Sequence, residues 1–332
     1  MNMPEQPTLL LTGGTGFIGR HLAMPLARVF PDHRRLMVVR GSAAACDQLW
    51  RPTSLDLVDS RALEELVEWA RPSIVVHLAA ESAFGSAALT AESVWRLNFD
   101  ATFALARAVA RYAPECLVLF TSTAQVYGAS FLGGPVTELT ATAPSTSYAV
   151  SKLAAEHVLR DTLSPSNQLI VTRAFNQCGP GQNTSFVLPS FAYQVVRAES
   201  GFRSPVVEVG NLEVERDFLH VTDAVEAYIR LLGLGRTSPR VLIANIASGR
   251  ASKLRDVLDL FCQQAGRPIE VRVDPRRVRS PEPPSMVGDA SLLRELTGWV
   301  PRFGVDDIVR DLLRYFRAAN DAGRSAGPEW AG

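Results

Sequence analysis

A glycine-rich turn near the start of the chain constrains the fold more than any other feature. Residues 9–22 read LLLTGGTGFIGRHL, so a short apolar stretch runs into a turn and an apolar-periodic segment follows. This order predicts a buried strand, a tight turn and a helix. Gly13, Gly16 and Gly19 have the spacing G-x-x-G-x-x-G. The first can take backbone angles closed to other residues, and the third lets the helix pack close to the strand.

The same turn has the features of a dinucleotide site. Its second glycine, Gly16, lets the main chain approach a pyrophosphate, and a helix that begins there points free N–H groups at the phosphates. A glycine-rich loop can also be no more than a tight turn, but its place between a strand and a helix favours a dinucleotide. The residues expected to hold the cofactor here are Gly13, Thr15, Gly16, Phe17, Ile18 and Gly19.

Composition limits the class of protein. The chain is 47% hydrophobic, which is enough for a large core. Its length of 332 residues allows one large elaborated domain or two domains. Because 34 basic residues balance 34 acidic ones, nucleic acid and anionic membranes are not expected partners. The sequence has no apolar run of membrane-spanning length and no secretory signal. The four cysteines lack metal-type spacing, so we expect free thiols, no metal and a cytoplasmic location.

Strands and helices alternate along the first half of the chain. Apolar runs at 35–40, 73–80 and 116–123 are separated by helical segments at 60–70 and 91–112. This alternation predicts an α/β fold, a Rossmann-type doubly wound parallel sheet with a smaller C-terminal substrate-binding α/β lobe. We expect residues 1–172 to form the dinucleotide-binding domain, with 214–246 returning to it. Residues 173–213 and 247–320 would form the lobe.

Two strand ends are candidates for the rest of the cofactor site. Arg40 ends the second strand, where an acidic residue would bind the 2′-hydroxyl of NAD. A cation beside Gly41 and Ser42 suits a 2′-phosphate, so NADP (NADPH) is favoured and NAD stays possible; a solvated arginine is the alternative. At the end of the run 73–80, the small alanines let the cofactor ribose lie close to the backbone. The residues assigned there are Leu78, Ala79 and Ala80, whereas His77 is expected to be a packed strand residue.

Tyr148 and Lys152 are the candidates for acid–base chemistry. They are four residues apart on a predicted helix, so they share one face. A nearby ammonium lowers the pKa of a phenol from about 10. Tyr148 would then exchange a proton with a substrate oxygen while hydride moves, and Lys152 would also hold the nicotinamide ribose. An ordinary surface pair is the alternative for this common pattern.

Thr123, at the end of the strand before this helix, completes a joint pattern. The glycine turn, Thr123, Tyr148 and Lys152 together resemble the extended short-chain dehydrogenase/reductase (NAD-dependent epimerase/dehydratase) family. The resemblance implies that the Thr123 hydroxyl binds the reacting oxygen, with Ser122 as its competitor. It also implies that Asp56 and Leu57, in a D-L-x-D segment, contact the adenine, while Asp59 or Ser60 could cap the next helix. Asn98 corresponds to the asparagine of the family's N-x-x-G-T segment.

The resemblance can be narrowed within the family. Its 4,6-dehydratases carry Asp-Glu before V-Y-G, and this chain has Ala124 and Gln125 there, which disfavours dehydration. Residues 173–182, RAFNQCGPGQ, are similar to a segment of the GDP-4-keto-6-deoxy-D-mannose reductases and GDP-mannose dehydratases. This likeness implies that residues of the second half bind the diphosphate, the sugar, and the ribose or base of a nucleotide sugar. For the arginines among them, a solvated basic loop is the alternative. The substrate residues so assigned are Ser82, Thr123, Ala124, Gln125, Asn176, Arg216, Arg279 and Glu282. Asp217 and Asp223 are expected to cap or brace the following helix.

The leading hypothesis is an NADP-dependent oxidoreductase of deoxysugar biosynthesis. It would reduce a nucleotide-linked 4-keto-6-deoxyhexose, GDP-linked by resemblance, with hydride to C4 and Tyr148 as proton donor. One alternative is a nucleotide-sugar 4-epimerase with bound NAD, and another is a non-catalytic NADP-sensing module. In extended relatives the helices corresponding to 92–112 and 148–161 form a four-helix interface, so we expect a homodimer or a dimer of dimers. The alternative is that these helices pack on the sheet alone.

Overall fold

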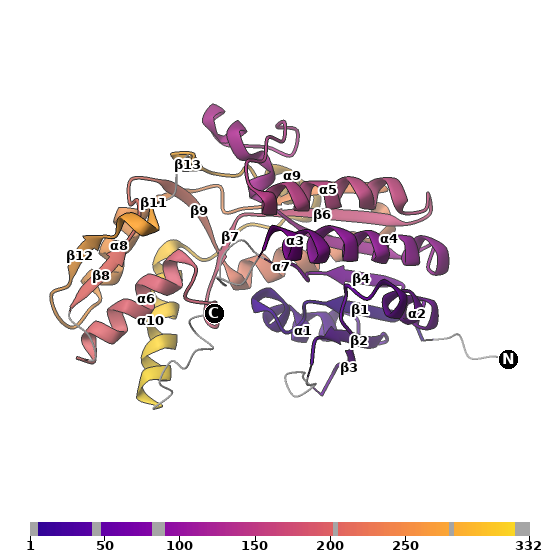
Figure 1. Cartoon of the computed structure of the whole chain (residues 1–332), viewed down its shortest axis with the longest axis horizontal. Coiled ribbons are helices and arrows are strands. Elements are labelled where there is room, and N and C mark those ends of the chain that lie inside the picture. The colour runs from indigo at the N-terminus through magenta and orange to yellow at the C-terminus, as the bar shows by residue number, and fades with distance from the viewer. Residues whose placement is uncertain (1–5, 42–47, 82–89, 202–204, 279–281, 323–332) are drawn as a thin grey trace.

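Seven parallel strands form the central sheet of the computed structural model, which describes residues 6–41, 48–81, 90–201, 205–278 and 282–322 (Figure 1). The strand order is β10-β6-β5-β4-β1-β2-β3, with every neighbouring pair parallel. The strands are β1 (Thr8–Thr12), β2 (Arg34–Val39), β3 (Arg51–Ser54), β4 (Ile74–His77), β5 (Leu117–Thr123), β6 (Gln168–Ala174) and β10 (Val241–Ile246). The order reverses between β1 and β4, which confirms the predicted doubly wound sheet.

Helices cover both faces of this sheet because its strands are apolar on both sides. In β1, Leu9 and Leu11 enter one core and Leu10 enters the other. Such strands need a helical layer on each face. The first core is covered by α1 (Phe17–Val29), α7 (Val221–Leu234) and α9 (Ser291–Thr297). The second is covered by α2 (Ser60–Ala70), α4 (Ala101–Tyr112) and α5 (Ser147–Thr162).

A smaller lobe with its own apolar core lies beside the sheet, on the left in Figure 1. Its strands form a four-stranded and a two-stranded sheet: β7 (Asn176–Cys178), β9 (Glu215–His220), β11 (Ala251–Lys253), β13 (Ser285–Met286), β8 (Val206–Val209) and β12 (Glu270–Val273). Its helices are α6 (Val187–Glu199), α8 (Leu254–Gln263) and α10 (Val305–Asp321). Helix α8 begins at Leu254, because residues 251–253 pair with β9.

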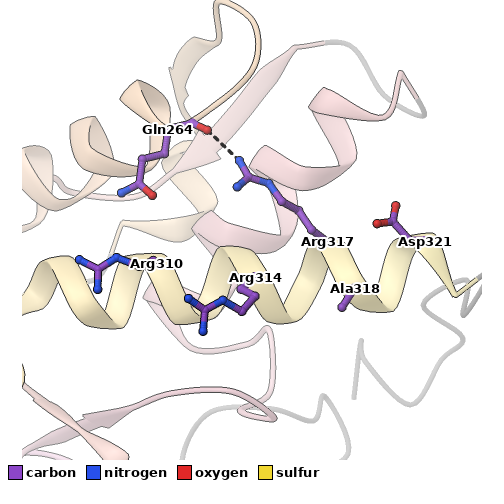
Figure 2. Close-up of a pocket in the computed structure, with 6 residues that line it drawn as sticks. All are labelled: Gln264, Arg310, Arg314, Arg317, Ala318 and Asp321. Carbon is purple, nitrogen blue, oxygen red and sulfur yellow. Dashed lines mark hydrogen bonds between the residues drawn. The ribbon is translucent and has the colours of Figure 1, made fainter.

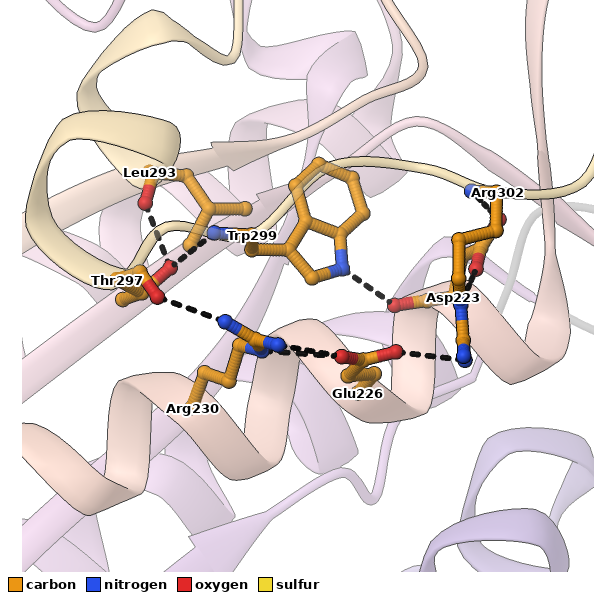
Figure 3. Close-up of polar contacts among 7 residues, drawn as sticks. All are labelled: Asp223, Glu226, Arg230, Leu293, Thr297, Trp299 and Arg302. Atoms are coloured by element: carbon orange, nitrogen blue, oxygen red, sulfur yellow. Dashed lines mark hydrogen bonds and ion pairs between the residues drawn. The ribbon is translucent and has the colours of Figure 1, made fainter.

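The segment that leads into α10 is fastened to α7 by Asp223 (Figure 3). The buried Asp223 carboxylate accepts hydrogen bonds from the backbone N–H groups of Arg302 and Phe303, both at 2.9 Å. The indole of Trp299 donates to the Asp223 carbonyl at 3.0 Å. A buried carboxylate must find donors, and these N–H groups supply them. The expectation that Asp223 caps or braces the following helix therefore holds as a brace and not as a cap, since His220 caps α7 by accepting from the Thr222 N–H.

Asp217 is likewise a brace between distant segments and not a helix cap. Its carboxylate accepts from the N–H groups of Ser248, Gly249 and Gly288 and from the Ser248 hydroxyl. These bonds hold two loops of the lobe against β9.

The helix expected at 91–112 contains a π-helical turn. Arg96–Asp100 form this turn between α3 (Ala91–Trp95) and α4, so the helix is continuous but locally widened. Single π-turns within α-helices often mark functional positions. Here the turn contains the buried Asn98.

Within the part of the chain that the structure describes, no helix is long and apolar enough to cross a membrane. The same residues contain no group of three or more His, Cys, Asp or Glu side chains that could hold a metal ion. Cys116, Cys178 and Cys262 are free thiols, and Cys46 lies outside the described residues.

Candidate active site

The glycine-rich turn packs tightly against the end of β4. Gly13 has φ of +69°, and a Cβ on it would lie 2.6 Å from the backbone nitrogen of Ala79. A Cβ on Gly19 would collide with the Gly13 carbonyl oxygen. Both positions therefore require glycine, for conformation at the first and for close packing at both. Gly16 is the N-cap of α1 and supplies no side-chain cap, so the first N–H groups of the helix stay available to an anion.

This turn fits a dinucleotide pyrophosphate, and the expected contact residues surround it. Thr15, Phe17 and Ile18 are partly exposed at the start of α1. Leu78 and Ala79 are partly buried and Ala80 is exposed, next to Gly13. Because β1 and β4 are neighbours at the reversal of strand order, the structure brings both sets together at the carboxyl edge of the sheet.

Arg40 and Asp56 lie farther along the same edge, beyond β2 and β3. Arg40 is exposed and follows β2 directly. The Asp56 carboxylate is exposed and accepts from the Val58 N–H at 3.2 Å, whereas Leu57 is buried. Asp59, in the same D-L-x-D segment, caps α2 as expected, because its carboxylate accepts from the Ala62 N–H.

Thr123 and Tyr148 meet across the end of β5. The Thr123 hydroxyl oxygen accepts from the Gln125 N–H at 3.3 Å, and its side chain lies close enough to the phenol of Tyr148 to lower the pKa of that phenol. The competitor Ser122 faces the other way, because successive strand residues point to opposite faces, and it donates to Glu156. The structure thus pairs Thr123, and not Ser122, with the tyrosine.

Burial is the largest cause of the pKa shifts of Tyr148 and Lys152 on α5. The Tyr148 residue keeps some exposure, but its phenol oxygen is surrounded by protein atoms, and burial raises the pKa of Tyr148 to about 12. Burial lowers the pKa of Lys152 to about 7, opposed by the charge of Glu156. The expectation that the ammonium lowers the phenol pKa is not met, because burial raises the pKa of Tyr148 and Lys152 is not among the groups that shift it. The Lys152 Nζ instead lies 4.1 Å from the centre of the Phe120 ring.

Three of the expected substrate residues gather at the four-stranded sheet of the lobe, with Arg216 on β9, Asn176 on β7 and Glu282 in the segment before β13. The buried Arg216 guanidinium pairs with the Glu282 carboxylate and donates to the Pro283 carbonyl at 3.2 Å. The Asn176 amide donates to the Asp217 carbonyl at 3.0 Å, on the neighbouring strand. Ala124 is buried and Gln125 half-buried beside Thr123, in the 3-10 segment Ala124–Gly133. Ser82 and Arg279 lie outside the described residues.

Sequence reasoning missed a buried ion pair beneath the site. The guanidinium of Arg173 pairs with the carboxylate of Glu156 at 2.8 Å, and the same guanidinium lies 4.9 Å from the Tyr127 ring centre. One signal was available, because Glu156 follows Lys152 by four residues and shares its helix face. Tyr228, whose buried phenol further raises the pKa of Tyr148, carried no such signal.

A hollow of about 380 Å³ on the lobe is separate from these residues (Figure 2). Arginines of α10 line it, but Arg317 pairs with Glu199 at 2.6 Å and donates to the Gln264 carbonyl at 2.7 Å. Arg310 pairs with Asp307 at 2.8 Å. Since these charges are already matched, we assign no ligand to the hollow.

The chain is similar over nearly its whole length to enzymes that act on nucleotide sugars. Residues 10–312 match the family described as GDP-mannose 4,6 dehydratase. A GDP-6-deoxy-D-mannose reductase of Pseudomonas aeruginosa is 32% identical over 308 residues, covering 92% of this chain and 95% of that protein. A UDP-glucose 4-epimerase of Azospirillum brasilense is 28% identical over 339 residues, covering 97% and 95%. The structure of RMD from Pseudomonas aeruginosa complexed with NADPH has a TM-score of 0.76 and 29% identity, covering 94% of this chain and 99% of that one.

Proposed function

Because the chain belongs to the GDP-mannose 4,6-dehydratase family of extended short-chain dehydrogenase/reductases, we propose that it is an NADP-dependent reductase of a nucleotide-linked 4-keto-6-deoxyhexose. The base would be guanine, as in the substrate named for the Pseudomonas aeruginosa relative. The contact between Thr123 and Tyr148, next to Ala124 and Gln125, is the observation that carries the proposal.

Tyr148 is the proposed proton donor to the oxygen at C4. A phenol with its pKa raised to about 12 stays protonated at neutral pH, which suits delivery of a proton to a developing alkoxide. Thr123 orients that oxygen with its hydroxyl. The dinucleotide, when bound at the Gly13 turn, supplies the hydride.

The lobe is the proposed nucleotide-sugar site, formed by residues 173–213 and 247–320 together with β9 (Glu215–His220), which joins the lobe's sheet although residues 214–246 were expected to return to the dinucleotide-binding domain. Arg216 would bind the diphosphate, Glu282 the ribose or base, and Asn176 the diphosphate or nearby sugar. The existing bonds of Arg216 to Glu282 and Pro283 hold its guanidinium in place before substrate arrives. Such preorganisation places C4 of the sugar with little further ordering.

Arg40 supports the preference for NADP. Its exposed guanidinium follows β2, beside Gly41 at φ of +88°, where little side-chain bulk would obstruct a 2′-phosphate. The NADPH bound in the Pseudomonas aeruginosa structure agrees with this preference by similarity.

The second candidate is a nucleotide-sugar 4-epimerase with retained NAD, favoured by the near full-length likeness to UDP-glucose 4-epimerase. A reductase consumes NAD(P)H in proportion to product, whereas an epimerase shows no net consumption. A third candidate, a non-catalytic NADP-sensing module, would have no need for the contact between Thr123 and Tyr148.

A panel of GDP-, UDP- and dTDP-linked 4-keto-6-deoxy sugars, offered with NADPH or NADH, tests these candidates. We expect loss of NADPH absorbance with a GDP-linked substrate and a C4 alcohol in the NMR spectrum of the product. Epimerised product without loss of absorbance would support the second candidate. Tight NADPH binding without turnover on any substrate would support the third.

We also propose a homodimer, or a dimer of dimers, built on α3–α4 and α5. Trp95, Phe99 and Phe103 form a row of rings on the first of these, with centroid separations of 5.7 and 6.4 Å. Phe103 is 37% exposed, and Val150 on α5 is 38% exposed. A second copy would cover this apolar row. Light scattering that gave a monomer mass at micromolar concentration would contradict the proposal.

A further inference from the structure

His77 is a buried imidazole at the end of β4, with both ring nitrogens engaged. It is 1% exposed, as expected for a packed strand residue. Its Nδ1 lies 2.6 Å from the Thr12 hydroxyl oxygen, and its Nε2 lies 3.0 Å from that of Thr102. Thr12 immediately precedes the glycine turn, whereas Thr102 belongs to α4. One side chain therefore joins the proposed cofactor turn to the opposite helical layer.

The hydrogen bonds around the ring fix its tautomer. Thr102 donates its hydroxyl hydrogen to the Asn98 carbonyl at 2.8 Å, so its oxygen must accept from Nε2–H. Nδ1 is then an acceptor, and Thr12 donates to it while accepting from the Ala79 N–H at 3.3 Å. Burial, followed by the charge of Lys152, lowers the pKa of His77 to about 3, so the ring is neutral at physiological pH.

The chain of hydrogen bonds continues from Asn98 to the catalytic helix. The Asn98 side-chain amide donates to the Ser151 hydroxyl at 3.2 Å, and that hydroxyl donates to the Tyr148 carbonyl at 2.8 Å. The π-helical turn places Asn98 between these partners. We call the series Thr12, His77, Thr102, Asn98, Ser151 and Tyr148 the Thr12–Tyr148 chain.

A second contact links His77 to Lys152. The imidazole stacks on the Phe120 ring, with centroids 5.7 Å apart. The Lys152 Nζ lies 4.1 Å from the centre of the same ring. His77 therefore supports the aromatic ring on which the ammonium rests.

We propose that His77 is a positioning residue, which couples the dinucleotide turn to the first turn of α5 through the Thr12–Tyr148 chain. Binding of the dinucleotide at Gly13 would fix Thr12, and His77 would transmit that position to Tyr148 and Lys152. Coupling between two sites is reciprocal. Removing a hydrogen bond of the Thr12–Tyr148 chain near α5 should therefore weaken dinucleotide binding at the turn. This inference rests on the proposed placement of the dinucleotide at the Gly13 turn.

The test measures the Kd for NADPH by nicotinamide fluorescence, without substrate, in Thr12→Val, Thr102→Val and the double variant. Loss of one buried hydrogen bond should weaken binding about fivefold in each single variant. The double variant should bind NADPH no more weakly than the single variants, because one substitution already interrupts the series of hydrogen bonds. Thr8→Val is the matched control, a buried threonine of the same strand whose hydroxyl accepts from Arg34. Its Kd should equal that of the wild type.

Two results would overturn the inference: an unchanged Kd in Thr102→Val, or independent effects that multiply to about 25-fold in the double variant. A second measurement is NMR of protein with ¹⁵N-labelled histidine. NADPH should shift the His77 Nε2 resonance in the wild type and not in Thr12→Val, whereas a merely structural histidine would not respond. Wild-type protein that binds no NADPH would overturn the proposed function as well. Normal wild-type binding with an unchanged Thr102→Val would overturn the coupling alone.

Discussion

Arg173 and Glu156 form an ion pair 2.8 Å long beneath the proposed active site, with side chains only 5% and 1% exposed. The pair joins β6 to α5. Its carboxylate also accepts from Ser122, one residue before Thr123 on β5. The strand end and the helix that supply the proposed catalytic groups are thus held by one buried charge pair.

Removing one charge from this pair should destabilise the fold strongly. Glu156→Gln would leave the Arg173 guanidinium buried without its counter-charge, and we expect a loss of about 3–5 kcal/mol in the free energy of unfolding. Urea denaturation measures it. Glu65→Gln is the control, since the Arg61–Glu65 pair on α2 is exposed and should contribute little. Equal denaturation midpoints for the two variants would contradict the structural role assigned to Glu156.

Tyr148→Phe should abolish most turnover and spare cofactor binding. The phenol oxygen is proposed to act on the substrate, so we expect kcat to fall about 10²–10⁴-fold with a nearly unchanged Kd for NADPH. Lys152→Ala should damage both, because Lys152 is proposed to hold the ribose as well. Tyr112→Phe is a matched control, since the Tyr112 hydroxyl bonds Glu64 on α2. Substantial activity in Tyr148→Phe would remove the tyrosine from the mechanism.

Local sequence patterns predicted the fold class and the family residues of this protein. They did not predict the contacts between residues that are distant in the sequence. The bounds of α2 follow from the sequence because its cap and its apolar face are local. The family resemblance carried by the glycine turn, Thr123, Tyr148 and Lys152 is confirmed. The partners of the Asp223 carboxylate lie 79 and 80 residues away in the sequence, so no local pattern indicated them. The raised pKa of Tyr148 was missed for a similar reason, because burial is a property of the assembled fold.

Lys152 should make stability rise with pH above neutrality. Its pKa is about 7 in the fold and about 10.4 in an unfolded chain, so between these values the unfolded state binds more protons. The free energy of unfolding then increases with pH, by at most about 1.4 kcal/mol per pH unit for one group. Lys152→Met should lose this rise. Urea midpoints at several pH values between 7 and 9 test it, and parallel profiles for wild type and variant would show that Lys152 is charged in the fold.

Arg40→Asp should reverse the cofactor preference. Loss of a charge-assisted contact to the 2′-phosphate, together with repulsion, should weaken NADPH binding about 10–100-fold and spare NADH. Fluorescence titration with both dinucleotides measures the ratio. Arg28→Asp, an exposed change in the last turn of α1, is the control. If the preference for NADPH survives Arg40→Asp, another residue binds the 2′-phosphate.

Offered GDP-mannose and NADP, the wild-type protein should form no 4-keto-6-deoxy sugar. Loss of water across C5 and C6 needs one group to take a proton from C5 and another to protonate the leaving hydroxyl at C6. The positions after Thr123 offer the buried methyl of Ala124 and the neutral amide of Gln125, and neither can exchange a proton near neutral pH. With NADPH, the same protein should still reduce a 4-keto-6-deoxy sugar supplied to it, because the dinucleotide would supply the hydride and Tyr148 the one proton that this step needs. Mass spectrometry of both reactions separates the two steps. Dehydrated product from GDP-mannose would restore the dehydratase assignment and show that a group outside this turn performs the elimination.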